Sequence, residues 1–139
     1  MKCTVDHIGI AVASLPEALA FYRDELGFEV EAPELVASQR VRAQFIRVDS
    51  VDPTPGGARL ELLEASAEDS PIARYIATRG PGIHHLALRV PDLVAALAQL
   101  KARGVRLIDE TPRAGAHDAL IAFIHPSSTH GVLVELIQA

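Results

Sequence analysis

The chain has 139 residues, of which 49% are hydrophobic and 22% charged, and its formal net charge is −5. This size and composition are typical of one globular domain spanning residues 1–139, and no apolar run approaches the roughly 20 residues that cross a bilayer. The acidic balance and the absence of a Lys/Arg run argue against nucleic acid or a membrane surface as the main partner. We therefore expect a small-molecule partner.

The N-terminal residues pass directly into a strand pattern and carry none of the features of a signal peptide. Cys3 is the only cysteine, so no internal disulfide can form, and we interpret it as a small buried side chain near the start of a strand. Both features suit the reducing cytoplasm, which is the location we expect for this protein.

The first predicted elements are a strand and an amphipathic helix. Apolar and polar residues alternate over residues 5–12, which predicts the strand. Ser14 and Glu17 have the spacing of a capping box, so a helix is expected to begin there and to end at Gly27. The apolar face of this helix recurs at three- and four-residue intervals and consists of Leu15, Ala18, Leu19, Tyr22 and Leu26.

Short apolar stretches and turn residues divide the rest of the chain. In the first half they predict strands at 28–30, 41–48 and 60–63, with a turn cluster at 49–57. The linker that follows contains a predicted short helix at 71–78. In the second half, Asp92 is the expected cap of a helix that ends at Gly104, and its apolar face consists of Leu93, Ala96, Leu97 and Leu100. Further strands are predicted at 105–108, 119–124 and 131–137.

The two halves are copies of one pattern. When His7 is set on His85, an offset of 78 residues (85 − 7), Val12 falls on Val90, Leu15 on Leu93 and Leu19 on Leu97. The repeat covers residues 1–66 and 82–139, joined by a linker at 67–81, and each copy has the order β-α-β-β-β. Because one copy alone leaves its apolar face uncovered, we predict an α+β fold in which two tandem βαβββ modules form a curled mixed sheet around a shared cleft.

Each half also supplies one histidine from its first strand and one glutamate from its last. These are His7 and Glu61, then His85 and Glu135, at intervals of 54 (61 − 7) and 50 (135 − 85) residues. Such a set suits a divalent ion; we expect Co²⁺, with Mn²⁺, Ni²⁺ or Zn²⁺ as alternatives. A strand histidine is more often structural, but Glu135 lies in an apolar strand where its charge needs a partner. Alternation sends His84 to the opposite face, and only His85 keeps the register of His7.

Several segments carry a more specific signal: Val5-Asp-His-Ile-Gly-Ile-Ala-Val12, Ser70-Pro-Ile-Ala73, Gly82-Ile-His-His-Leu-Ala87, Gly115-Ala-His117, His125-Pro126 and Gly131-Val-Leu-Val-Glu135. Together they resemble the methylmalonyl-CoA epimerase family of the vicinal-oxygen-chelate superfamily, over nearly the whole chain. The resemblance implies the glyoxalase-like fold and a divalent metal. It also implies interconversion of (2R)- and (2S)-methylmalonyl-CoA. The implied metal ligands are His7, Glu61, His85 and Glu135.

In such an enzyme the metal binds the thioester and carboxylate oxygens and stabilises the enolate that is left when the α-proton departs. Glu135 is the expected general base for one face of the substrate. Some epimerases carry a second glutamate on the third strand, at the position of Ala43 in this sequence, and alanine cannot transfer a proton. Glu61 is therefore the second candidate base.

The resemblance further implies an acyl-CoA substrate and a homodimer, and the apolar content of the chain suits association. His117 and Arg113 are the candidate contacts to carboxylate, pantetheine or phosphate groups of that substrate. Two alternatives stay open. A glyoxalase I-like lyase or another enzyme of the superfamily would use the same four ligands. A non-catalytic small-molecule binding protein of the bleomycin-resistance type commonly lacks them.

Overall fold

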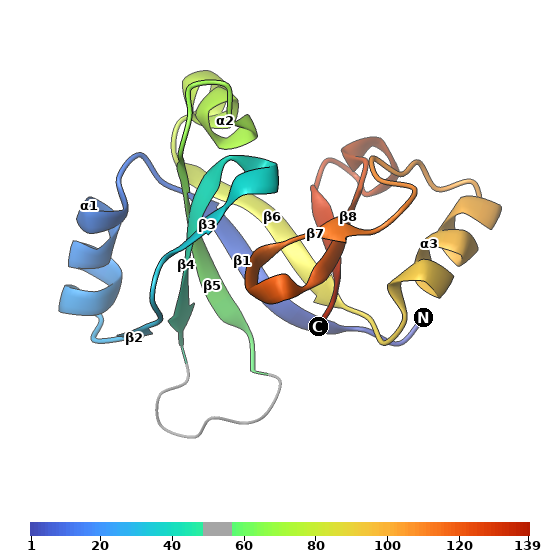
Figure 1. The fold of residues 1–139 in the computed structure, drawn as a ribbon, viewed down its shortest axis with the longest axis horizontal. Helices are drawn as coiled ribbons and strands as arrows, with labels where there is room; N and C mark the ends of the chain where they lie inside the picture. The colour runs from blue at the N-terminus through green and yellow to red at the C-terminus, as the bar shows by residue number, and fades with distance from the viewer. Residues whose placement is uncertain (49–56) are drawn as a thin grey trace. The chain divides into compact units, whose positions relative to one another are not determined.

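The protein is described by a computed structural model over residues 1–48 and 57–139 (Figure 1). The predicted turn cluster at 49–57 lies outside the described residues except for its last position. Cys3 is exposed rather than buried, because the first strand begins only at the next residue. No helix of the described residues is long and apolar enough to cross a membrane.

The described residues form two compact units. We call them the first unit (His7–His84) and the second unit (Met1–Asp6 with His85–Ala139). The first strand of the chain and the first strand of the second repeat each pass from one unit into the other. The organisation as one domain with repeats 1–66 and 82–139 stays a prediction.

The sheet of the first unit has the strand order β2-β4-β5-β1, and β3 also pairs with β4. β1 runs parallel to β5, whereas the other pairs are antiparallel. The strands are β1 (Thr4–Ala11), β2 (Glu29–Val30), β3 (Glu34–Val36), β4 (Val41–Arg47) and β5 (Arg59–Ala65). All of them except β3 were predicted, and β3 escaped prediction because three residues are too few to show an alternating pattern.

The helix α1 (Leu15–Leu19) begins at the predicted capping box. The hydroxyl of Ser14 accepts a hydrogen bond from the backbone N–H of Glu17 at 3.3 Å. The chain then continues as a π-helical segment, η1 (Ala20–Glu25), and leaves the helix at Gly27 with a φ of 75°. Both ends of the helix therefore lie where the cap residues predicted them.

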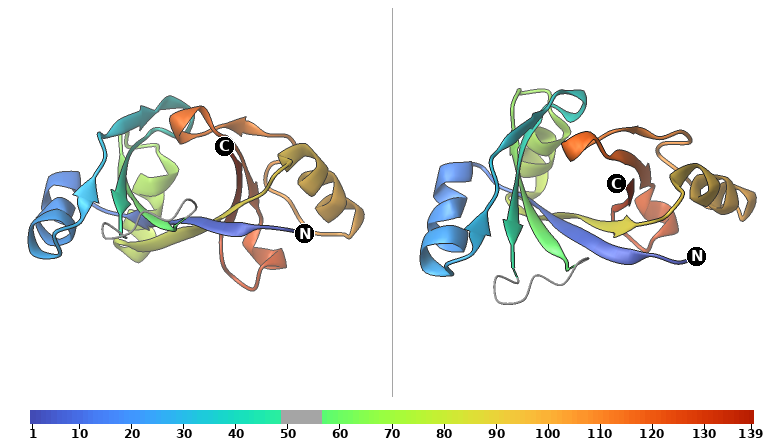
Figure 2. Two further views of the ribbon diagram at one scale, coloured as in Figure 1. Left: turned by 90° about the horizontal axis from the view of Figure 1, so that it is seen from below. Right: turned by 60° about the horizontal axis from the view of Figure 1, so that its bottom comes forward.

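α1 lies beside the sheet of the first unit, and an apolar cluster fills the space between them (Figures 1 and 2). The buried members are Val12, Leu15, Leu19, Ile46 and Leu62. Leu26 was predicted on the same apolar face but is 47% exposed. The reason is the π-helical segment, whose hydrogen bonds join residues five apart and so rotate later positions away from the α-helical register.

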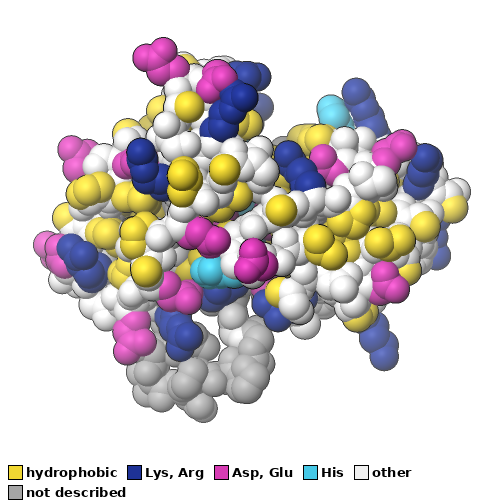
Figure 3. All heavy atoms as spheres, viewed as in Figure 1, with side chains coloured by type: hydrophobic (Ala, Val, Ile, Leu, Met, Phe, Trp, Pro, Cys, Tyr) yellow, Lys and Arg dark blue, Asp and Glu magenta, His cyan; other side chains and the backbone are white. Residues whose placement is uncertain are grey.

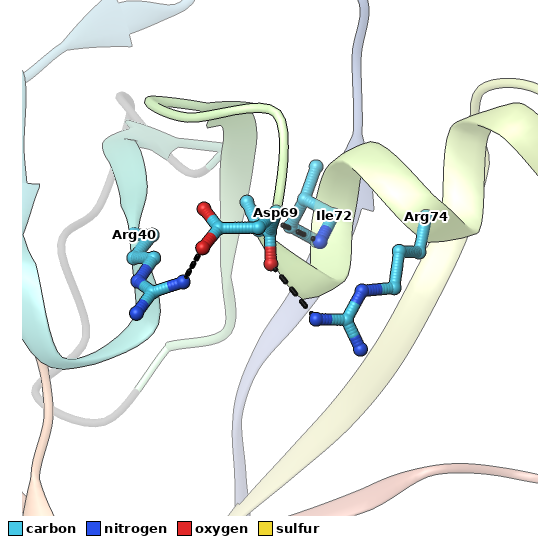
Figure 4. Close-up of polar contacts among 5 residues, drawn as sticks. Arg40, Asp69, Ile72 and Arg74 are labelled. Atoms are coloured by element: carbon cyan, nitrogen blue, oxygen red, sulfur yellow. Dashed lines mark hydrogen bonds and ion pairs between the residues drawn. The ribbon is translucent and has the colours of Figure 1, made fainter.

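The helix α2 (Pro71–Arg79) confirms the short helix predicted in the linker, and the buried Ser70 is its N-cap. The residue before the cap, Asp69, is held from two sides (Figure 4). Its carboxylate pairs with Arg40, and its backbone carbonyl accepts a hydrogen bond from the Arg74 side chain at 3.1 Å. These contacts fasten the start of α2 to the turn that precedes β4.

The sheet of the second unit has the order β6-β9-β8-β7, with β6 parallel to β9 and the other pairs antiparallel. The strands are β6 (Gly82–Arg89, in this unit from His85), β7 (Arg113–Ala114), β8 (Leu120–Ile124) and β9 (Val134–Gln138). β8 and β9 confirm two predicted strands, although β9 starts later than expected. β7 was not predicted, since a two-residue strand carries no periodicity.

The helix α3 (Leu93–Ala102) repeats the device used by α1. The Asp92 carboxylate accepts a hydrogen bond from the backbone N–H of Ala95 at 3.0 Å, and Gly104 follows the helix with a φ of 80°. The apolar face of α3 packs against β8 and β9. The buried members of this core are Val90, Leu93, Ala96, Leu97, Ala122, Ile124, Val134 and Leu136.

The predicted strand at 105–108 is wrong, because this segment forms only an isolated bridge from Leu107 to β8. The backbone N–H groups of Ile108 and Asp109 both donate to the carbonyl of Phe123, at 2.9 and 3.2 Å. The Asp109 carboxylate in turn accepts from the N–H of Phe123 at 2.8 Å. A side chain thus takes the hydrogen bond that the next step of a regular ladder would use.

Candidate metal centre

His7 and Glu61 form the first of two buried histidine–glutamate pairs, which we call the first half-site. In the parallel pairing of β1 with β5, Glu61 lies opposite Gly9, two residues after the histidine. Alternation therefore directs both side chains to the same face of the sheet. His7 Nε2 and Glu61 Oε1 are 3.5 Å apart, and the two residues are 1% and 6% exposed.

His85 and Glu135 form the second half-site, in the second unit, by the same construction. β6 and β9 are parallel neighbours, and Glu135 lies opposite Ala87, again two residues after the histidine. His85 Nε2 and Glu135 Oε2 are 3.6 Å apart, and the residues are 4% and 5% exposed. The small side chain at position 87, like the glycine at position 9, leaves room for the imidazole beside the carboxylate.

A phenylalanine that the sequence analysis missed lies against each half-site. Phe45 is opposite Glu61 in the pairing of β4 with β5, and its ring meets that of His7 edge-to-face with centroids 5.3 Å apart. Phe123 is opposite the glutamate of β9 in the same way, 5.9 Å from the ring of His85. The offset between the phenylalanines is 78 residues (123 − 45), the same as between the histidines. The repeat therefore contained a signal that would have found them.

An arginine guanidinium lies over each phenylalanine ring. Arg59 is 4.1 Å from the centroid of Phe45, and Arg113 is 5.2 Å from that of Phe123. Arg113, a predicted substrate contact, also has its Nε 3.5 Å from the Asp109 carboxylate, while its side chain is 40% exposed. Each half-site is thus followed, one aromatic ring away, by a positive charge.

His117, the other predicted substrate contact, is an exposed residue of the short turn η3 (Ala116–Asp118) between β7 and β8. Its φ of 56° is in the left-handed region, which non-glycine residues adopt uncommonly. A turn position does not by itself assign a role, so a substrate contact from His117 stays a prediction.

His84 lies on the other face of β6 from its neighbour His85, as alternation predicts. Its ring packs edge-to-face against Tyr75 of α2 with centroids 4.9 Å apart. Burial, and to a lesser degree the charge of Arg79, lowers the pKa of His84 to about 4. His84 is therefore neutral at pH 7 and belongs to the packing between β6 and α2.

The donors of each half-site fit a divalent cation. Two donors held about 2.1 Å from one ion are about 3.0 Å apart at a right angle and about 3.4 Å apart at the tetrahedral angle. The observed separations of 3.5 and 3.6 Å are close to the tetrahedral value and too long for an ordinary hydrogen bond. Imidazole with carboxylate is also a donor set that Co²⁺, Mn²⁺, Ni²⁺ and Zn²⁺ accept.

Comparison with known proteins agrees with this arrangement. Residues 6–123 match the glyoxalase/bleomycin resistance protein/dioxygenase superfamily. The chain is similar to the uncharacterized protein YqjC of Bacillus subtilis, with 41% identity over 134 residues that cover 96% of this chain and 91% of YqjC. It is also similar to the ethylmalonyl-CoA/methylmalonyl-CoA epimerase of Cereibacter sphaeroides, with 38% identity over 137 residues that cover 96% of each chain.

The likeness extends to three dimensions. A solved structure of a methylmalonyl-CoA epimerase in complex with methylmalonyl-CoA and NH4+ shares 37% of its sequence with this chain. The two superpose with a TM-score of 0.92 over 100% of this chain and 96% of the other. The predicted fold class, two tandem βαβββ modules of the glyoxalase type, is thereby confirmed.

Proposed function

This chain belongs to the glyoxalase/bleomycin resistance protein/dioxygenase superfamily, and from that premise we propose that it interconverts the (2R) and (2S) forms of methylmalonyl-CoA. The observation that carries the proposal is the pair of half-sites, each with a buried histidine and glutamate built on parallel strands. The relatives that are named as epimerases support it, and they agree with the predicted class of isomerase.

The proposed metal ligands are His7 and Glu61 of the first half-site with His85 and Glu135 of the second. Their equivalent construction, and the single offset that relates the two histidines, favour one shared ion rather than two. Co²⁺ is the proposed ion, with Mn²⁺, Ni²⁺ or Zn²⁺ as alternatives. A bound divalent ion supplies Lewis-acid stabilisation of the negative charge that develops on the substrate oxygens.

Glu135 is the proposed general base for one face of the substrate. The α C–H bond lies between a thioester and a carboxylate, so its electron pair can pass into the carbonyl system as an enolate while the proton moves to a carboxylate oxygen. Glu135 is buried beside Phe123, and this apolar surrounding keeps water away from that transfer. Epimerisation also requires a proton donor on the opposite face. Glu61 is the candidate that the sequence suggests for it.

The proposed substrate contacts are Arg113 and His117. Arg113 lies over Phe123, the ring beside the second half-site, and its side chain is partly exposed. A guanidinium in that position can bind a carboxylate or phosphate oxygen of an acyl-CoA. The proposed assembly is a homodimer. Apolar side chains interspersed with charges on the surface in Figure 3 support it, and the most exposed are Ile83, Val94 and Leu35. A cytoplasmic location is proposed as well.

The function is tested by following one epimer of methylmalonyl-CoA in deuterated water with the Co²⁺-loaded protein. We expect deuterium at the α-carbon and convergence on a mixture of both epimers, at a rate well above that of buffer containing the same metal. A rate equal to that of buffer, together with conversion of a thiohemiacetal substrate, would support the glyoxalase-like alternative instead. Tight substrate binding without either reaction would favour the non-catalytic alternative.

A further inference from the structure

The structure brings a carboxylate to the place where the sequence left one missing. We propose that Glu34 of β3 is the second proton-transfer residue, the group that exchanges a proton with the face of the substrate opposite to Glu135. The inference rests on the proposed epimerase function, because only inversion at the α-carbon requires groups on both faces.

The register of the strands places Glu34 on the same face as the first half-site. Glu34 lies directly opposite Ala43 in the antiparallel pairing of β3 with β4, and paired residues direct their side chains to one side of a sheet. Ala43 is two residues before Phe45, whose ring touches that of His7. Since side chains two residues apart share a face, Glu34, Phe45 and His7 do so as well. Figure 1 shows β3 alongside β4.

The exposure of β3 supports the same orientation. Leu35 points outward and is 62% exposed, whereas its neighbours on either side are half-buried Glu34 and Val36, which is 7% exposed. Val36 lies opposite Val41, which is 2% exposed. The carboxylate of Glu34 thus starts from the protected side of the strand.

Ala43 leaves space that a longer side chain would fill. It is 1% exposed, and its single methyl group is the only side-chain atom opposite Glu34 on β4. Glu34 and Glu61 are separated by one intervening strand, about 10 Å across the sheet, and by two residues, about 7 Å, along it. Two glutamate side chains that start at this separation can lie on either side of a small acyl group.

Other carboxylates of the first unit are committed elsewhere. Glu64 accepts hydrogen bonds from the backbone N–H of Leu15 and from Arg42, both at 2.8 Å. The carboxylate of Glu31 is paired with Arg59 at 3.5 Å. Glu61 is the proposed metal ligand beside His7, and coordination occupies the lone pairs that a base would use.

The proposed step is balanced by proton exchange alone. The α C–H bond breaks toward Glu135, its electron pair forms the enolate, and the proton becomes an O–H bond of that carboxylic acid. The O–H bond of protonated Glu34 then breaks, its electron pair stays on the carboxylate, and the proton forms the new C–H bond on the other face. In the reverse direction the two residues exchange roles, and solvent restores their protonation between turnovers.

The test is the variant Glu34→Gln, measured for both epimers in deuterated water. We expect epimerisation to fall on the order of 10²-fold or more. One epimer should still exchange its α-proton with retention of configuration, through Glu135, while the other epimer should become inert. Adding Ala43→Glu to Glu34→Gln should restore inversion, because position 43 faces the same space. Glu29→Gln, at an exposed position of β2, is the matched control and should behave as wild type.

Each outcome is decisive. Undiminished epimerisation by Glu34→Gln, with metal content and melting temperature unchanged, would overturn the role of Glu34. Loss of exchange from both epimers in a folded, metal-loaded Glu34→Gln protein would also overturn it, because a positioning defect would affect both faces. A wild-type protein that neither exchanges nor epimerises would refute the proposed function itself, and the role of Glu34 with it.

Discussion

Glu135→Gln separates the two roles proposed for this residue, metal ligand and general base. The side chain is 5% exposed, lies 3.6 Å from His85 and faces Phe123 across the strand pair, so a substitution that keeps its size is required to preserve the packing. Glutamine is nearly isosteric, and its amide oxygen can still coordinate a cation. It cannot accept a proton. If proton transfer limits turnover, the rate should fall on the order of 10²-fold or more, which corresponds to at least about 2.7 kcal/mol of activation free energy.

The assay is stereospecific exchange of the α-proton, with metal content and the melting temperature measured on the same sample. We expect Glu135→Gln to be the mirror image of Glu34→Gln: the epimer that retains exchange in one variant should be inert in the other. Glu61→Gln should keep exchange on both faces when saturated with metal, if Glu61 acts as a ligand alone. Full activity of Glu135→Gln with the metal still bound would refute the assignment of the base.

Three further predictions concern stability, pH and substrate binding. Removal of the metal by a chelator should lower the melting temperature by about 5–10 °C relative to protein in metal at about 100 times its dissociation constant, since such binding stabilises by about 2.7 kcal/mol; an unchanged melting temperature would argue against a metal held by folded residues. In metal-free protein, the free energy of unfolding should decrease as the pH falls from 6.5 toward 4, by up to about 1.4 kcal/mol per pH unit, because the unfolded chain protonates His84 before the folded protein does. His84→Gln should reduce that slope, and an identical slope in the variant would exclude His84 as its source. Arg113→Ala should raise KM for the acyl-CoA with a smaller effect on kcat, whereas an unchanged KM would remove Arg113 from the substrate site.

The parts of the fold that could be predicted depend on local chemistry. Ser14 and Asp92 cap their helices through hydrogen bonds to residues three positions later, so the signal is contained in a short segment. The choice of His85 over His84 followed from alternation and from the repeat. It agrees with the burial of His85 and with the packing of His84 against α2.

What could not be predicted depends on contacts between segments distant in the sequence. The strand β3 is only three residues long, so the placement of Glu34 opposite Ala43 emerges only from the sheet register. The 105–108 segment has the composition of a strand, but the Asp109 carboxylate ends the pairing. Phe45 and Phe123 are a different case. Their offset was available in the sequence, and they were missed because apolar strand residues are expected in any core.

The central claim is that the two half-sites bind one ion. Its most direct test is the number of metal equivalents per chain, measured by elemental analysis after equilibration with Co²⁺ for the wild type, His7→Ala and His85→Ala. We predict one equivalent for the wild type and loss of tight binding in each single variant, because each removes a ligand from the same ion. Two equivalents in the wild type, with one retained in each variant, would contradict the claim and indicate two independent sites.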